Sequence, residues 1–338
     1  MENLEKNSLL VNKSNNLVTH ILQFWPSNIS HNITVGLSGG IDSVVLLHAL
    51  HQIATSCKPL QLSAIHVNHG ISPNANSWSS FCHDLCQSLN IPLTIKNCVL
   101  AKPGGESLEN IARKARYKEF FACDEDVIAL AHHQDDQVET TLSQLFRGSD
   151  LHNIAAMHAV SMKNNNLIWR PLLDISRKQI EAYASTYDLQ YITDESNADI
   201  KYLRNFIRHK VIPLISEWDT QIKTKLLNFN VQLQDILALT DEIAEADLIA
   251  CLLEDQFKNE LVIIDLNKFK LLSHPRQSNL IAWFIKSSNL PLPSSDQLKE
   301  FIRQIINSNY DKKPQLKLNS SHAIIKYKTK IFIEKICN

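Results

Sequence analysis

The chain has 338 residues, of which 44% are hydrophobic and 20% charged, and its formal net charge is -1. These values are typical of a globular protein, and the length predicts two domains, or three small ones. A net charge this close to zero excludes a global positive field, so any nucleic-acid binding has to come from local patches.

The seven cysteines are an odd number and include no Cys-x-x-Cys pair. This pattern predicts reduced thiols and argues against a zinc knuckle or a redox motif. The N-terminal residues are polar, unlike a signal peptide, and no apolar run is long enough to span a membrane. We therefore expect a cytoplasmic protein with no membrane partner.

Short apolar runs alternate with helical patterns along the first half of the chain. Strands are predicted at residues 33–37, 60–67, 93–99, 127–131 and 167–169, and helices at residues 44–53, 77–89, 108–121 and 176–187. This alternation predicts an α/β domain with a doubly wound parallel sheet. Ligands of such sheets bind at the carboxyl ends of the strands, and all seven glycines lie before residue 149.

The second half of the chain has a different pattern. Residues 201–250 are predicted to be helical, with a break at Pro213. Further on, strands are predicted at residues 261–265, 316–318, 323–327 and 331–334, and helices at residues 277–286 and 295–305. We therefore expect a first domain at residues 1–215, a helical linker at 216–250 and a smaller C-terminal α+β domain at 251–338.

A loop with two adjacent glycines follows the first predicted strand and precedes a helix. Its residues are Ser38, Gly39, Gly40, Ile41, Asp42 and Ser43. Backbone N–H groups in such a loop, together with the helix N-terminus, form a cradle for phosphate. The acid Asp42 is favourable beside a phosphate if it holds a magnesium ion that bridges to the phosphate. The alternative is a plain strand–helix turn with a Ser or Asp cap.

An acidic cluster with two histidines follows the fourth predicted strand. On a helix, Asp135 and Glu139 lie four residues apart and Asp136 and Glu139 three apart, so the acids share a face. Carboxylates at the carboxyl end of a strand can bind Mg2+ or a cationic amine. The alternative is a capping box of Asp136 with Glu139. We favour binding, because a cap does not explain the adjacent pair His132 and His133.

Two predicted helices carry pairs of arginines. Arg113 and Arg116 lie three residues apart and suit phosphate, because a guanidinium donates hydrogen bonds in pairs. Arg204 and Arg208, beside Asn205, form a basic face that suits an RNA backbone. The alternatives are a solvated basic face for the first pair and an ordinary amphipathic helix for the second.

The glycine loop resembles the signature of the ATP-pyrophosphatase (PP-loop) superfamily, whose members cleave ATP between the α and β phosphates and adenylate a carbonyl oxygen. Further motifs are His-Val-x-His-Gly at 66–70, Ala-Arg-x-x-Arg-Tyr at 112–117, Asp-Asp-x-x-Glu-Thr at 135–140, Arg-Pro-Leu-Leu at 170–173 and Arg-Asn-x-x-Arg at 204–208. In this order, across residues 33–214, the set resembles the tRNA(Ile)-lysidine synthetase family.

The resemblance implies a reaction on the wobble cytidine of an isoleucine tRNA, tRNA(Ile), whose anticodon is CAU. The 2-oxo oxygen of the base attacks the α-phosphate of ATP, and the ε-amine of free L-lysine then displaces AMP. The product, lysidine, changes the codon read from AUG to AUA and the amino acid from methionine to isoleucine. ATP, as co-substrate, and Mg2+ are the implied cofactors.

The same resemblance implies roles for the residues named above. Residues 38–43 would bind ATP, with Asp42 holding Mg2+, and Arg113 would balance charge on ATP or RNA. Asp136 and Glu139 would bind the lysine ammonium or a metal ion, and one of them would take its proton. Substrate contacts are expected from His133, Asp135, Arg116, Arg204, Asn205 and Arg208.

Residues 221–338 resemble the first C-terminal domain of that family loosely, and we expect them to contact tRNA. Lys326, Lys328 and Lys330 alternate along a predicted strand and so point to one face; alternatively, they protect an edge strand from aggregation. Many members carry a further domain for the tRNA acceptor end, and this sequence stops before it. The sequence does not decide the oligomeric state, and a homodimer stays open.

Three other functions fit part of the sequence. A PP-loop tRNA thiolase would need reactive cysteines; Cys82 and Cys86 share a predicted helical face, but buried apolar cysteines are commoner. A non-catalytic nucleotide-binding protein would bind ATP without tRNA-dependent turnover. A PP-loop enzyme that amidates a small molecule would leave the basic helix at 201–210 and the second domain without a task.

Overall fold

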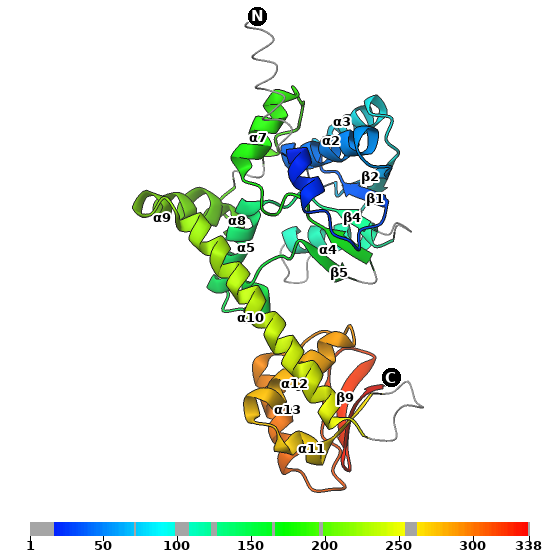
Figure 1. The fold of residues 1–338 in the computed structure, drawn as a ribbon, viewed down its shortest axis with the longest axis vertical. Helices are drawn as coiled ribbons and strands as arrows, with labels where there is room; N and C mark the ends of the chain where they lie inside the picture. The colour runs from blue at the N-terminus through cyan, green and yellow to red at the C-terminus, as the bar shows by residue number, and fades with distance from the viewer. Residues whose placement is uncertain are drawn as a thin grey trace, which may run out of the picture. The chain divides into compact units, whose positions relative to one another are not determined.

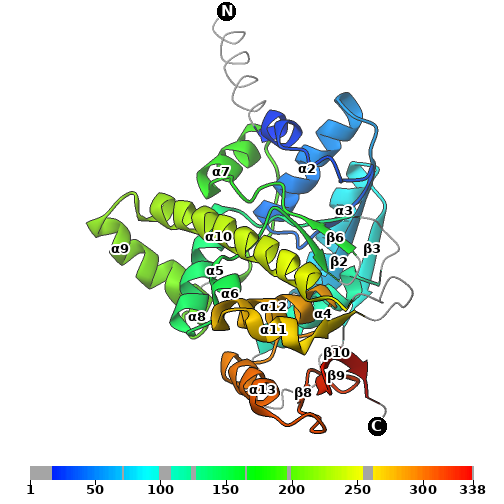
Figure 2. The same cartoon turned by 60° about the horizontal axis from the view of Figure 1, so that its bottom comes forward.

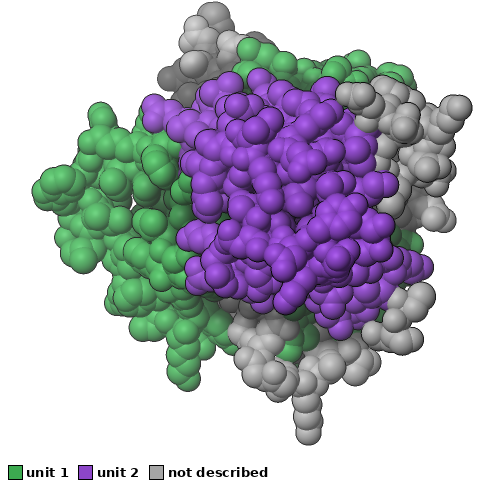
Figure 3. Space-filling model, turned by 90° about the horizontal axis from the view of Figure 1, so that it is seen from below, with its two compact units in different colours: residues 1–230 green, residues 231–338 purple. Residues whose placement is uncertain are grey.

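The computed structural model describes residues 17–70, 72–98, 108–122, 127–163, 166–195, 199–253 and 262–336. The chain divides into two compact units, residues 1–230 and residues 231–338, which Figure 3 shows in different colours. The division falls inside one 30-residue helix, α10 (Ile222–Cys251). Within the described ranges, every helix is too short or too polar to cross a bilayer.

The first unit is built on a six-stranded sheet with the order β3-β2-β1-β4-β6-β5 (Figures 1 and 2). The strands are β1 (Asn32–Gly36), β2 (Gln61–Asn68), β3 (Leu93–Asn97), β4 (Val127–Ala129), β5 (Val160–Lys163) and β6 (Asn166–Trp169). All pairings are parallel except that of β5 with β6. The predicted doubly wound parallel sheet is confirmed. The edge strand β5 is absent from the prediction, because its four residues are too few and too polar to form an apolar run.

Side chains alternate along the strands and fill a core on each face of the sheet. On β4, Val127 and Ala129 belong to one core and Ile128 to the other. The helices that cover the sheet are α2 (Ile41–Ser56), α3 (Ala75–Ser88), α7 (Arg177–Thr186) and α4 (Leu108–Phe120). α2, α3 and α7 pack on the face of Val127, whereas α4 packs on the face of Ile128.

The order of the strands reverses between β1 and β4, which are neighbours although β2 and β3 lie between them in the sequence. A crevice forms at such a reversal, because the connections that follow the two strands leave in opposite directions. The glycine loop follows β1. The acidic cluster follows β4 and opens helix α5 (Gln134–Phe146), after which comes the short α6 (Leu151–Ile154). The fold therefore brings the two strongest sequence motifs to one edge of the sheet.

The helical segment after residue 203 does not break at Pro213, and that prediction is wrong. α8 (Leu203–Phe206) runs through a π-helical turn, η2 (Ile207–Val211), directly into α9 (Ile212–Trp218). Pro213 lies in the first turn of α9, and the widened turn before it relieves the clash between the ring and the preceding carbonyl groups. The break comes at Asp219, whose extended backbone ends α9.

The second unit is an antiparallel sheet covered by helices, which confirms the predicted α+β fold. The strands are β7 (Ile263–Asp265), β8 (Gln315–Lys317), β9 (His322–Tyr327) and β10 (Lys330–Lys335), and they lie in the order β7-β10-β9-β8. The helices are α11 (Leu266–Leu271), α12 (His274–Ser287) and α13 (Ser295–Asn307). Phe269, Phe284 and Phe301 lie in its core. The short helix α11 is absent from the prediction.

The three lysines expected on one strand face do not lie on one strand. β9 ends at Tyr327, which pairs with Lys330 on β10, so Lys328 lies in the turn between them with a φ of 52°. The side chain of Lys326 is only 1% exposed. Its Nζ donates to the carbonyl oxygens of Asn309, Tyr310 and Lys312 at 2.7, 3.3 and 3.2 Å. The prediction that Lys326 contacts tRNA is therefore wrong, and that for the exposed Lys328 stays a prediction.

We expect Lys326→Met to destabilise the second unit by about 2 kcal/mol, because the buried Lys326 Nζ donates to three carbonyl groups that would lose their common donor. Lys328→Met serves as the control, since it removes the same charge from an exposed turn and should change stability by less than about 0.5 kcal/mol. Urea unfolding of the full chain measures both values. Equal stabilities of the two variants would contradict a structural role for Lys326.

Candidate active site

The glycine loop between β1 and α2 is held together by its two serines. Ser43 Oγ donates to the carbonyl oxygen of Gly40 at 2.9 Å and accepts from the N–H of Ser38 at 3.2 Å. Gly40 is the N-cap residue of α2, and no side chain caps the helix there. The alternative of a plain turn with a Ser or Asp cap is therefore wrong. The first-turn N–H groups of α2 are left for a ligand, as a phosphate site requires.

Gly39 is the residue of the loop for which the backbone demands glycine. Its φ is +86°, and a Cβ at this position would lie 2.6 Å from Ile192 Cδ1. Its carbonyl oxygen accepts from the N–H of Ile192 at 2.9 Å. This contact ties the loop to the segment that leads toward α8.

Asp42, in the first turn of α2, is paired with Arg177 at the start of α7. Arg177 Nη1 donates to Asp42 Oδ1 at 2.7 Å. The same oxygen lies 3.7 Å from His133 Nε2, which reaches it from the β4 side of the crevice. The structure thus brings together two residues, Asp42 and His133, that lie in separate sequence motifs.

His133 is the N-cap residue of α5. Its Nδ1 accepts from the N–H of Asp135 at 3.3 Å, and Asp136 Oδ2 accepts from the N–H of His133 at 2.9 Å, which completes a capping box. The expected alternative, a box of Asp136 with Glu139, is wrong, and so is the view that a cap does not explain the histidine. Because Nδ1 accepts a hydrogen bond, a neutral ring carries its proton on Nε2, toward Asp42 and Asp136.

Asp136 and Glu139 lie on one face of α5, as predicted, and their partners are Arg204 and Arg208. Arg204 donates to Asp136 Oδ1 at 2.5 Å and to Glu139 Oε2 at 2.8 Å. Arg208 donates to Glu139 Oε1 and Oε2 at 2.6 and 2.9 Å. The basic face expected to meet RNA is therefore directed at α5, and the contact of these two arginines with RNA is a prediction that this geometry opposes.

The pKa values of the two aspartates of the crevice, Asp42 and Asp136, are shifted in opposite directions. Burial raises the pKa of Asp42, and His133 and Arg177 offset only part of that rise. Burial would also raise the pKa of Asp136, but Arg204 and His133 outweigh it and lower that pKa to about 2. Environments that separate the pKa values of neighbouring acids are typical of catalytic sites.

The other predicted residues lie on neighbouring elements of the first unit. Asp135 Oδ1 accepts from Lys223 Nζ at 2.9 Å, and Asn205 Nδ2 donates to the carbonyl oxygen of Asp199 at 2.9 Å. On α4, Arg116 Nε donates to His69 Nε2 at 3.4 Å. Arg113 lies one turn before Arg116, beside Tyr117.

Sequence reasoning missed Arg177 and Lys223 as partners of the acids. Arg177 has a signal in the sequence, since a cation in the first turn of a helix opposes the helix dipole and needs an acidic neighbour. Lys223 has none, because 88 residues separate it from Asp135. Among the described residues, no group of three His, Cys, Asp or Glu side chains is placed to hold a metal ion.

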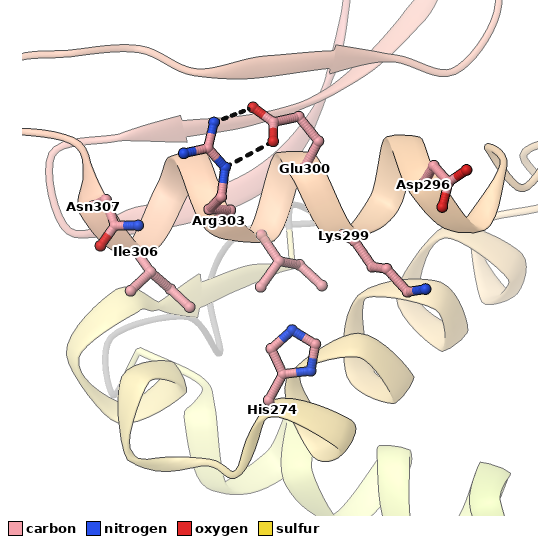
Figure 4. A pocket seen from close by; sticks show the side chains of 8 residues that line it. His274, Asp296, Lys299, Glu300, Arg303, Ile306 and Asn307 are labelled. Carbon is pink, nitrogen blue, oxygen red and sulfur yellow. Dashed lines mark hydrogen bonds and ion pairs between the residues drawn. The ribbon is translucent and has the colours of Figure 1, made fainter.

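A separate hollow of about 460 Å³ lies in the second unit between α12 and α13 (Figure 4). Its lining includes His274, Asp296 and Lys299, while Arg303 forms a double hydrogen bond with Glu300. The charge of Arg303 is thus satisfied within α13. This hollow contains none of the predicted site residues.

We expect Gly39→Ala to lower the free energy of unfolding by about 2 kcal/mol, because the residue needs a left-handed backbone and has no room for Cβ. Gly40→Ala is the matched control: its φ is −71°, and the nearest atom to an added Cβ is Ser38 Oγ at 3.5 Å. Its unfolding should stay within about 0.5 kcal/mol of the parent chain. Thermal unfolding distinguishes the two, and equal melting temperatures would contradict this role of Gly39.

Asp136→Asn should lower the stability of the chain at pH 7 by about 2 kcal/mol, the value that corresponds to a pKa lowered from 3.8 to about 2. Because the folded pKa is depressed, this contribution is present above pH 4 and is lost as the pH falls toward 2. Unfolding by urea between pH 2.5 and 7 should therefore show a shallower pH dependence for the variant. Parallel curves for parent and variant would argue against the ion pairs.

Two protein-family models match the chain. The model described as a PP-loop domain matches residues 13–215, and the one described as a TilS substrate binding domain matches residues 264–331. Among solved structures, the U34-tRNA thiolase NcsA from Methanococcus maripaludis, solved with its 4Fe-4S cluster, has a TM-score of 0.54 at 19% identity over 68% of this chain and 80% of that one. At this identity the similarity shows a shared fold.

Three curated relatives are named tRNA(Ile)-lysidine synthase. The protein from Chromobacterium violaceum is 39% identical over 88% of this chain and 68% of its own length, that from Nitrosomonas europaea 40% over 82% and 60%, and that from Actinobacillus pleuropneumoniae 36% over 89% and 69%. The chain thus spans about two thirds of their length. With its PP-loop domain and this identity over most of its residues, the chain belongs to the tRNA(Ile)-lysidine synthase family.

Proposed function

We propose that this chain uses ATP to join L-lysine to the C2 carbon of the wobble cytidine in tRNA(Ile) with a CAU anticodon, which gives lysidine. The observation that carries the proposal is the uncapped N-terminus of α2 behind two glycines, at a crevice that also holds Asp42, His133 and Asp136. The names of the relatives supply the substrate class.

The glycine loop would hold the phosphates of ATP through backbone N–H groups of residues 38–43. Asp42 suits a magnesium ion, because burial raises its pKa and Arg177 and His133 offset this only in part, so a further cation would stabilise its charge. The remaining ligands of the ion would come from phosphate and water. The ion would neutralise charge on the phosphates while the pyrophosphate leaves.

In the first step, the 2-oxo oxygen of cytidine attacks the α-phosphorus. A new P–O bond forms, the bond to the bridging oxygen breaks, and pyrophosphate leaves with the electron pair. The cytidine would have to leave its base stack to enter the crevice between β1 and β4. Arg113, on α4, would balance negative charge on the phosphates of ATP or RNA.

In the second step, the neutral ε-amine of lysine attacks C2, the C2–O bond breaks, and AMP leaves. Asp136 and Glu139 are assigned to the lysine ammonium. Their four carboxylate oxygens already accept hydrogen bonds from Arg204, Arg208 and the His133 backbone, so lysine would bind by replacing an arginine contact. Arg204 is the residue to be displaced, because it alone bridges both acids with short bonds.

The thiolase alternative has less support in the chain's own residues. Cys82 and Cys86 are buried in the core of the first unit, and burial raises their pKa values to about 12 and 11. Thiols of this kind are poor nucleophiles at neutral pH. Both are free thiols.

The proposal is tested with purified chain, ATP, Mg2+, labelled lysine and tRNA(Ile) bearing the CAU anticodon. We expect label to become joined to the tRNA, to depend on ATP, and to be low with methionine tRNA. Asp42→Asn should reduce tRNA-dependent pyrophosphate release at least about 100-fold without lowering the melting temperature. Turnover of ATP without lysine transfer would favour a thiolase, and ATP binding without turnover with any tRNA would refute both enzymes.

A further inference from the structure

Arg170 is a buried cation for which the described residues supply no acidic partner. It follows β6 at the carboxyl edge of the sheet and is only 7% exposed. Its Nη1 donates to the carbonyl oxygen of His158 at 2.8 Å and to Ser161 Oγ at 3.0 Å, while its Nε is buried without a hydrogen-bond partner. Neutral oxygens satisfy N–H groups but leave the positive charge uncompensated, which is unfavourable in a protein interior.

Two more cations, Arg113 and Lys163, lie around the aromatic ring of Tyr117. Tyr117, a buried residue of α4, raises the pKa of Arg170 against the effect of burial. The guanidinium carbon of Arg113 lies 5.2 Å from the centre of its ring, and Lys163 Nζ lies 4.5 Å from it. Arg177, by contrast, is held by the carboxylates of Asp42 and Glu181. In the described part of the chain, none of the three cations around Tyr117 has such a partner.

The positive charge extends from this ring to the crevice. Burial lowers the pKa of Arg170, Tyr117 counteracts this, and Arg113 lowers the pKa further. Burial also lowers the pKa of His132 to about 3, and although Asp136 opposes this, Arg170, Arg204 and Arg113 act in the same direction as burial. His132 Nδ1, too, is buried without a partner in the described chain. Among the described residues, Asp136 is thus the acid whose charge acts on His132, and the three cations around Tyr117 form no ion pair with a carboxylate.

We propose that Arg113, Lys163 and Arg170 form a binding site for a backbone phosphate of the RNA substrate, separate from the glycine loop that takes ATP. The inference rests on the proposed function, because it takes RNA to be the substrate of this unit. The exposed Arg113 and Lys163 would meet the phosphate oxygens, and the buried Arg170 would supply charge behind them.

The position favours RNA over ATP as the source of the phosphate. The glycine loop follows β1, whereas Arg170 follows β6, two strands away in the sheet, which is about 10 Å at the usual spacing of strands. β4, which lies between them, leads into the crevice with His133 and Asp136. A phosphodiester held by Arg113 and Lys163 would fix the backbone while the neighbouring nucleotide enters that crevice.

The test compares Lys163→Ala with Lys58→Ala in the full chain. Both lysines lie over an aromatic ring, since Lys58 Nζ is 4.2 Å from the ring centre of Trp25, but Lys58 precedes β2, which is separated from β5, the strand of Lys163, by β1, β4 and β6. We expect Lys163→Ala to weaken binding of tRNA(Ile) about fivefold and to reduce the slope of log Kd against log salt by about 1, with the KM for ATP unchanged. Lys58→Ala should change neither value.

Arg170→Met and Arg170→Lys then test the buried cation itself. We expect Arg170→Met to weaken tRNA binding about tenfold. Arg170→Lys should recover part of that loss, because lysine restores the positive charge but not the paired N–H donors of the guanidinium group. A raised KM for ATP with unchanged tRNA affinity would assign the phosphate to ATP and overturn the proposal. A lower melting temperature of the Arg170 variants with unchanged tRNA affinity and salt slope would also overturn the proposal, because it would show that Arg170 only stabilises the fold.

The two proposals fail separately. A parent chain that binds tRNA with these effects of Lys163 and Arg170 but transfers no lysine would refute the proposed reaction and leave the phosphate site in place. A chain that transfers lysine normally after Lys163→Ala and Arg170→Lys, at limiting tRNA, would refute the phosphate site and leave the reaction in place.

Discussion

Two buried carboxylates on α5 determine how the first unit is assembled around its crevice. Glu139 is 1% exposed, and a buried carboxylate without a partner costs several kcal/mol. The guanidinium groups of Arg204 and Arg208 offset that cost, so α8 and η2 have to pack against α5. Because α5 starts directly behind β4, the same ion pairs fix the helical segment 203–211 beside the point where the strand order reverses.

The sequence was sufficient to predict those helices and strands that show a local periodicity of apolar residues. The parallel strands and their helices were predicted because buried runs and helical spacing are visible over five to fifteen residues. The turn of the hairpin at Lys328 was not predicted, because it contains none of the Gly or Asn residues that usually mark a left-handed position. The three lysines around it were therefore expected on one strand. The edge strand β5 and the helix α11 are too short to give a pattern.

The candidate site was predictable in its residue types but not in its pairings. Asp42, His133, Asp136 and Glu139 could be singled out, since the topology of an α/β sheet brings the segments after β1 and β4 together. Their partners could not, because 135 residues separate Asp42 from Arg177 and 65 separate Glu139 from Arg204. No local spacing encodes such contacts, so the basic face that contains Arg204 predicts an RNA contact and gives no sign of the carboxylates that it meets.

The depressed pKa of Asp136 limits what this side chain can do in any reaction at neutral pH. A carboxyl group with a pKa of about 2 stays ionised through the whole physiological range, so it is an electrostatic anchor and a very weak proton acceptor. If lysine is the second substrate, its amine, with an ordinary pKa of about 10.4, then has to lose its proton to a group other than Asp136. Alkaline activation of the transfer step would accordingly report on the incoming nucleophile, and the protein would contribute a fixed field in which that nucleophile is held.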